Sequence, residues 1–155
     1  MAGGEKGAYT MAAPGEKDLA RLLATLKVTT NPETFVFLTF PSSEAPPPTL
    51  FQQMSFREKE GLAVITTLAS ALEHGIKDIT FPCRMITCEV HSSLETVGFM
   101  AKTTDCLTNR GIGANCVAGY FHDHLFVEGR VEDAVAALEE MVKETRGKEP
   151  QGVSR

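Results

Sequence analysis

The stretch that decides the fold spans residues 84–127 and reads RMITCEVHSSLETVGFMAKTTDCLTNRGIGANCVAGYFHDHLFV. It opens at 84–90 with β-branched and apolar residues, which predict a strand. Ser92 and Glu95 then have the spacing of a capping box, in which a hydroxyl and a carboxylate satisfy free backbone N–H groups at a helix start. We therefore predict a helix that begins at Ser92 and ends near Gly111, a residue suited to a left-handed helix end.

A hairpin and a second helix follow. Short apolar runs at 113–119 and 124–128 predict two strands, and YFHD between them predicts the turn. Residues 130–146 are amphipathic and predict a helix. The element order is β-α-β-β-α, and no further strand follows in the sequence. We expect a strand from the first half of the chain to take the place of the fourth strand of a β-α-β-β-α-β unit.

The first half has its own mixture of strands and helices. Residues 16–27 have the apolar spacing of a helix, and the aromatic run at 34–40 predicts a strand. The proline-rich segment 41–48 is expected to be an exposed loop, because proline donates no hydrogen bond to a sheet. A strand at 62–67 and a short helix at 68–75 come next. This order favours two similar modules that share or pair antiparallel sheets.

The predicted organisation has four parts. Residues 1–16 are expected to be a disordered leader, and residues 147–155 a flexible tail, because both segments are polar. The N-terminal module is placed at 17–83 and the C-terminal module at 84–146. Near the boundary, Pro82 interrupts a strand-like run, so we expect a bulge or a break there.

The composition excludes several classes of protein. The 155 residues are 43% hydrophobic and 23% charged, as in ordinary globular domains. The net charge of −5 provides no basic field to hold nucleic acid or anionic lipid. No apolar run reaches the roughly 20 residues that span a bilayer. The four cysteines lack Cys-x-x-Cys spacing, so we expect free, buried thiols and a cytoplasmic location.

The stretch 84–127 resembles the ACT domains, which are small amino-acid-binding regulatory modules. It is most similar to the paired ACT modules of the CASTOR-type arginine sensors and to small stand-alone bacterial and fungal proteins. Three segments carry the resemblance: Ser-Leu-Glu-Thr-Val-Gly at 93–98, Cys-Val-Ala-Gly-Tyr at 116–120 and His-Asp-His-Leu at 122–125. The likeness covers roughly residues 55–127, and it is weaker in the first module.

This resemblance implies two ferredoxin-like βαββαβ modules of the α/β class with a free amino acid bound between them. It generally implies no chemistry and no cofactor. The ligand-binding residues it indicates, with their immediate neighbours, are Ser92, Ser93, Leu94, Glu95, Thr96, Gly98, Gly119, Tyr120, His122 and Asp123. Thr96 stands where the arginine sensors have an acid, and Gly119 where they have a threonine. Fewer carboxylates would therefore surround the ligand than in the arginine sensors. The neighbouring Glu95 could supply the missing acid, but its capping role competes, so the identity of the amino acid stays open.

The residues support the same function by themselves. A helix that begins at Ser92 would present free N–H groups and the positive end of its dipole to an α-carboxylate. Asp123 in the predicted turn would supply the opposite charge for an ammonium or a guanidinium group. Both residues also have ordinary structural roles, as a helix cap and as a turn residue.

Other functions remain open on the sequence. His122 and His124 are two residues apart, so both could reach one metal ion, and His91 could join them. Cys116 with His122 could form a nucleophilic pair, although we expect Cys116 to point into the core. A small enzyme or accessory protein of amino-acid-derived metabolism would use Asp123, His122 and His124. A purely structural interaction module would bind no ligand.

The expected partners follow from the binding function. A sensor without an output domain of its own would act on another protein, such as an amino-acid biosynthetic enzyme or a signalling partner. Module pairs of this type also assemble through sheet edges or helices, which allows a homodimer.

Overall fold

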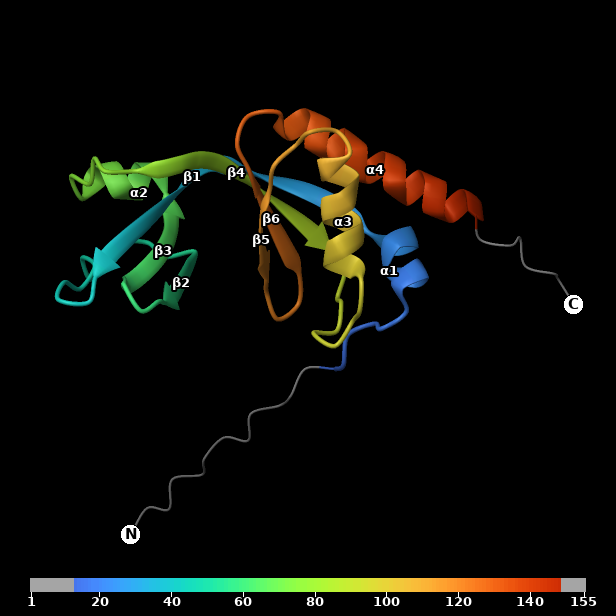
Figure 1. Cartoon of the computed structure of the whole chain (residues 1–155), viewed down its shortest axis with the longest axis horizontal. Helices are drawn as coiled ribbons and strands as arrows, with labels where there is room; N and C mark the ends of the chain where they lie inside the picture. The colour runs from blue at the N-terminus through green and yellow to red at the C-terminus, as the bar shows by residue number, and fades with distance from the viewer. Residues whose placement is uncertain (1–12, 149–155) are drawn as a thin grey trace, which may run out of the picture.

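One antiparallel sheet organises the computed structural model, which describes residues 13–148 (Figure 1). The six strands have the order β2-β3-β1-β4-β6-β5. The strands are β1 (Lys27–Pro41), β2 (Met54–Arg57), β3 (Gly61–Thr67), β4 (Thr80–Glu89), β5 (Asn115–Ala118) and β6 (Asp123–Val127). The helices are α1 (Leu19–Thr25), α2 (Leu68–Glu73), α3 (Phe99–Thr108) and α4 (Val131–Lys148). No helix in the described part of the chain is long and apolar enough to cross a membrane.

Two long strands are common to both halves of the sheet. The C-terminal half has the order β1-β4-β6-β5, and the N-terminal half has the order β4-β1-β3-β2. Each half thus contains the four strands of a β-α-β-β-α-β unit, and β1 is the fourth strand that the C-terminal half needs. The prediction that the first half of the chain supplies this strand is confirmed, as are the ferredoxin-like α/β class and the antiparallel pairing.

The four described helices cover one face of the sheet. Side chains of directly paired residues point to the same side, so the register of β1, β4 and β6 assigns each residue to a face. The helices α1, α3 and α4 pack over the C-terminal half, while α2 packs against β1 and β3 (Figure 1). The core under the first three helices contains Leu22, Leu26, Ile86, Cys88, Leu125, Val127 and Leu138.

On the opposite face, which no described helix covers, a cluster of aromatic side chains is buried. Phe35 and Phe126 are fully buried there, and their rings meet edge to face with centroids 5.8 Å apart. Phe37 contacts Phe126 in the same way at 5.6 Å. These rings come from β1 and β6, which are separated by β4, so they pack together because the sheet is strongly curled. This aromatic cluster joins the two halves of the sheet.

Two prolines interrupt the shared strands, as expected of a residue that cannot donate to a sheet. The register of β1 against β4 shifts between Thr30 and Thr34, on either side of Pro32. A second shift lies opposite Pro82, where Phe81 has a φ of 55°. The prediction of a bulge at Pro82 is confirmed, whereas the strand through 27–33 was not predicted because its polar residues show no apolar alternation.

The predicted start of the helix after β4 is wrong. The helix α3 begins at Phe99, and its N-cap is Gly98, which has a φ of 91° and provides no side-chain cap. Ser92 instead forms an isolated parallel bridge with Glu16, outside the strands of the sheet. The amide of Glu95 donates to the hydroxyl of Ser93, so no capping box forms. Residues 92–98 are a loop, which we call the site loop.

The predicted limits of the modules cut through continuous elements. The boundary at 83 and 84 lies inside β4, and α1 contacts α3 and α4 of the other half. Gly147 and Lys148 of the predicted tail belong to α4, and its remaining residues, 149–155, lie outside the described part. Of the predicted leader, residues 1–12 also lie outside it. The division into modules therefore stays a prediction.

Candidate functional site

The site loop is held by the segment that precedes α1. This segment, residues 13–17, is called the strap. The amide of Glu16 donates to the carbonyl of His91 at 2.9 Å, and the carbonyl of Glu16 accepts from the amide of Ser93 at 3.0 Å. The same carbonyl accepts from the hydroxyl of Thr96 at 2.9 Å. One strap residue therefore fixes both the beginning and the middle of the site loop.

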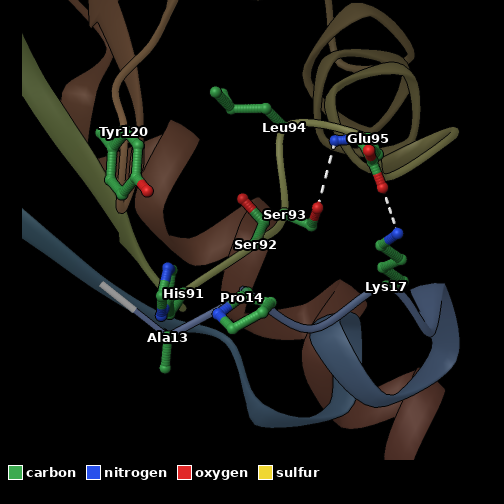
Figure 2. A pocket seen from close by; sticks show the side chains of 10 residues that line it. Ala13, Pro14, Lys17, His91, Ser92, Ser93, Leu94, Glu95 and Tyr120 are labelled. Carbon is green, nitrogen blue, oxygen red and sulfur yellow. Dashed lines mark hydrogen bonds and ion pairs between the residues drawn. The ribbon is translucent and has the colours of Figure 1, made fainter. Parts of the chain in front are cut away.

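Two further features bring the strap and the loop together. A Cβ atom on Gly15 would lie 2.5 Å from the carbonyl carbon of Ser92, so only glycine fits this approach. Lys17 forms an ion pair with Glu95, as Figure 2 shows. The carboxylate of Glu95 thus points to the strap and not to a helix start. Its pKa is lowered, chiefly by the hydrogen bond from Lys17.

A first hollow of about 720 Å³ lies on one side of the site loop. Figure 2 shows the hydroxyl of Tyr120 directed from the hairpin toward the loop across this space. Tyr120 and Leu94 are 52% and 68% exposed, so the hollow is open to solvent. Its lining residues are Ala13, Pro14, Gly15, Lys17, His91, Ser92, Ser93, Leu94, Glu95 and Tyr120.

A second hollow of about 350 Å³ lies between the site loop, α3 and β5. It shares Ser92, Ser93 and Leu94 with the first, so these residues form the wall between the two. Its lining residues are Ser92, Ser93, Leu94, Thr96, Phe99, Met100, Cys116, Ala118 and Asp123.

Asp123 is the distinctive group of the second hollow. It is the first residue of β6, where it pairs with Cys88 and Ala118, and it is only 8% exposed. Its expected position in the turn was wrong, because the hairpin turn ends at His122. The hydroxyl of Ser92 donates to its Oδ2 at 3.4 Å. Burial raises the pKa of the Asp123 carboxyl, while Ser92 and the nearby histidines act in the opposite direction.

Seven of the ten predicted residues line one or both hollows. Three do not. Gly98 caps α3. Gly119 closes the hairpin by donating its amide to the carbonyl of His122, and a Cβ on Gly119 would lie 2.7 Å from that oxygen. His122 directs Nδ1 to the carbonyl of Val90 at 3.3 Å. These three residues shape the surroundings of the hollows, and their part in binding stays a prediction.

Several lining residues were not predicted from the sequence. Phe99 and Met100 line the second hollow because α3 begins seven residues later than predicted. Lys17 and the strap lie more than seventy residues away in the sequence, and no local pattern indicates their contact with the site loop. Cys116 was expected in the core, but it is exposed on the edge strand β5. Alternation along β5 places it on the same face as Ala118.

His122 and His124 have different hydrogen-bond partners. His124 pairs with Thr87 on the helix-free face, and its Nδ1 lies 3.0 Å from the Thr87 hydroxyl. Burial lowers the pKa of His124. No group of three or more metal-binding side chains gathers among residues 13–148. Burial also raises the pKa of Cys116, whereas a nucleophilic cysteine needs a lowered one.

Models of a known protein family match both halves of the chain. One ACT domain model matches residues 14–84, and a second ACT domain model matches residues 80–140. Together they account for both halves of the sheet. The chain belongs to the ACT-domain family and contains two ACT modules. No curated protein matches it.

Solved structures with the same fold include three informative ones. A Vibrio cholerae protein of unknown function, described as a possible transport protein, is 32% identical over 83% of this chain and 98% of its own, with a TM-score of 0.68. An Agrobacterium tumefaciens protein is 17% identical over 76% and 89%, with a TM-score of 0.63. The regulatory subunit of aspartate kinase from Thermus flavus is 9% identical over 74% and 95%, with a TM-score of 0.53. The last two show the fold alone.

Proposed function

We propose that the protein binds a free amino acid in the second hollow and that its occupancy is read by another protein. The observation that carries this proposal is Asp123, a carboxylate buried at the wall of a hollow and bonded to a single hydroxyl, that of Ser92. A buried carboxylate is stabilised by a cation that brings its own hydrogen bonds. The α-ammonium group of an amino acid is such a cation.

The family membership supports the regulatory part of the proposal. ACT domains generally bind small amino-acid ligands and regulate enzymes. The protein that responds to the ligand would be a separate one, such as an amino-acid biosynthetic enzyme or a signalling protein. The free cysteines agree with a reducing, cytoplasmic location.

Exposed apolar side chains around the two hollows provide a surface for such a partner or for a second copy of the chain. Val97 is 86% exposed on the site loop, beside Leu94. Tyr120 and Phe121 are half-exposed on the hairpin, where their rings are 5.0 Å apart. A contiguous patch of exposed apolar side chains often marks an interaction surface.

A thermal-shift screen of the purified protein against the twenty amino acids tests the proposal. A ligand at about 100 times its dissociation constant adds about 2.7 kcal/mol to the free energy of unfolding, which raises the Tm by several degrees. We expect a selective rise, and we expect Asp123→Asn to abolish it.

The matched control is Asp105→Asn, which makes the same change in charge on the exposed face of α3 and outside both hollows. This variant should respond like the wild type. Absence of any rise with all twenty amino acids would reject the proposal, and so would a rise that Asp123→Asn leaves intact.

A further inference from the structure

The charges around the second hollow are few and unbalanced. Asp123 is the only carboxylate among the described residues that line it, and no Lys, Arg or His lines it. The other lining groups are hydroxyls, a thiol and apolar side chains. A ligand therefore meets one buried negative charge and no positive side chain.

The carboxylate of Asp123 can accept more hydrogen bonds than it receives. An ionised carboxylate has about four acceptor positions. The hydroxyl of Ser92 is its one hydrogen-bond donor within residues 13–148, and at 3.4 Å this bond is long. Oδ1 accepts no hydrogen bond from the described residues. A single ammonium group with three donors would satisfy both oxygens, but it would leave no acid for a second cation.

The beginning of α3 also lines the second hollow. This helix is ten residues long, and its first two residues, Phe99 and Met100, line the hollow. Its N-cap, Gly98, has no side chain that could accept from the first-turn amides. These amides and the positive end of the helix dipole suit a carboxylate. Asp123 supplies the second, independent feature, because a buried acid in the same hollow points to a ligand that carries both charges.

The remaining wall is apolar. Phe99 is buried, Met100 is half-buried, and Leu94 and Ala118 complete the surface together with Cys116. Methionine and cysteine are adaptable, polarisable partners for aliphatic or thioether groups. A charged side chain against Phe99 and Met100 would lose part of its hydration without gaining a charged partner.

We infer that the second hollow selects a neutral amino acid with an apolar side chain and discriminates against diamino and dicarboxylic amino acids. Its ammonium group binds Asp123, its carboxylate faces the start of α3, and its side chain lies against Met100 and Cys116. A diamino acid would bury a second cation without a carboxylate, and a dicarboxylic acid would place a negative charge near Asp123. This inference rests on the proposed function and narrows its ligand.

The test is calorimetric titration with leucine, methionine and valine as neutral probes, lysine as the diamino probe and glutamate as the dicarboxylic probe. We expect at least one neutral probe to bind at least about tenfold more tightly than lysine and glutamate, a difference of about 1.4 kcal/mol. Tighter binding of lysine or glutamate would overturn the inference.

A second carboxylate in the wall should reverse the selectivity. Cys116→Asp adds this charge on an exposed edge strand, where folding tolerates it. It should weaken binding of the neutral probe and strengthen binding of lysine. Asn115→Asp adds the same charge one residue away, on the other face of β5, and should change neither affinity by more than about threefold. Equal effects of the two variants would contradict the inference.

The two failures can be told apart. If no amino acid binds the wild type, the proposed function fails together with this inference. If lysine or glutamate binds most tightly and the binding depends on Asp123, the proposed function stands and the inference about ligand class is wrong.

Discussion

The two halves of the sheet have the same strand order but different connections and different charges. In the C-terminal half, the chain passes from β4 through the site loop and α3 to β5. In the N-terminal half, it passes from β1 to β2 through the proline-rich segment, and no helix lies between them. At the third strand, β6 begins with buried Asp123, whereas β3 begins with Gly61.

The N-terminal half also has a hollow at the corresponding place. It has a volume of about 470 Å³ and lies between the end of β1 and the turn from β2 to β3. Its charged residues, Glu44, Arg57 and Glu58, are exposed. A Cβ on Gly61 would lie 2.1 Å from the carbonyl oxygen of Phe40, so a side chain cannot occupy the position that Asp123 has in the other half.

Strand order thus creates a hollow in both halves, whereas individual residues make the C-terminal hollow a candidate site. A buried acid, a helix start and a fixed loop coincide in the C-terminal half only. We therefore expect ligand binding there, while the N-terminal half supports the site through the shared strands β1 and β4.

Removal of the aromatic ring that joins the two halves should have the largest effect. Phe126 is fully buried and contacts Phe35 and Phe37 across the curled sheet. Phe126→Ala should lower the free energy of unfolding by about 3–5 kcal/mol in urea denaturation, because a cavity remains. Phe56→Ala, at a side chain that is 63% exposed on β2, should cost less than about 0.5 kcal/mol.

Because the two halves share strands, we also predict that the wild type unfolds in a single transition. Separate transitions of the N-terminal and C-terminal halves in urea would contradict this description, because neither half has a complete sheet without β1 and β4.

Replacement of the strap glycine, Gly15, should have the next largest effect on stability. Gly15→Ala places a Cβ against the backbone of Ser92 and Ser93, so the strap must move away from the site loop. We expect a loss of about 1–2 kcal/mol in unfolding free energy. We also expect faster amide hydrogen exchange at Ser93, whose amide donates to Glu16.

The control for the strap is Gly113→Ala, at a glycine where a Cβ would meet no atom within 4 Å. It should leave exchange at Ser93 unchanged. Equal protection of Ser93 in all three proteins would show that the strap does not hold the site loop.

The pH dependence of stability should differ in sign between two carboxyl groups. Burial raises the pKa of Asp123, so the folded state binds its proton more tightly than the unfolded state does. The contribution of Asp123 to the free energy of unfolding is therefore most favourable below 3.8, the pKa of its carboxyl in the unfolded state. This contribution is lost as the pH rises through the higher pKa of the folded state. Asp123→Asn should remove this loss and become more stable, relative to the wild type, as the pH rises from about 3 to 7.

Glu89 should behave in the opposite way, because a hydrogen bond from Thr29 lowers its pKa. The contribution of Glu89 to the free energy of unfolding is present above the pKa of its carboxyl in the unfolded state. It is lost as the pH falls through the lower pKa of the folded state. Glu89→Gln should therefore become relatively less stable as the pH rises. If the stabilities of the two variants changed with pH in the same direction, the environments described for Asp123 and Glu89 would be contradicted.

The smallest effects are expected at the histidines. If the protein binds a ligand without chemistry, His122→Ala and His124→Ala should change the affinity for an amino acid by less than about threefold. His124 lies on the helix-free face, and His122 bonds to a backbone carbonyl. Loss of binding in both variants would favour an enzyme or a metal site.

Much of the fold could be predicted because its signals are local. The amphipathic pattern of α4, the aromatic run in β1 and the proline at the β4 bulge each indicated the correct element. The start of α3 could not be predicted in this way. The spacing of Ser92 and Glu95 is the same in a capping box and in this loop, and the choice depends on contacts with Glu16 and Lys17.

The candidate site could likewise be predicted only where its signals are local. Ser92 and Asp123 could be named from the sequence because a hydroxyl and an acid lie near predicted element ends. Their mutual hydrogen bond, and the exposure of Cys116 in the same hollow, follow from how β4, β5 and β6 pair. Pairing over such distances is not encoded in any short pattern.

An NMR titration tests the central claim most directly. Amide chemical shifts of the ¹⁵N-labelled protein would be followed as the amino acid with the largest thermal shift is added. We predict saturable changes in the site loop, at the start of α3 and at Asp123, with no change in residues 41–46 or 57–62 of the N-terminal hollow. Changes centred on the N-terminal hollow, or no saturable change anywhere, would contradict the account.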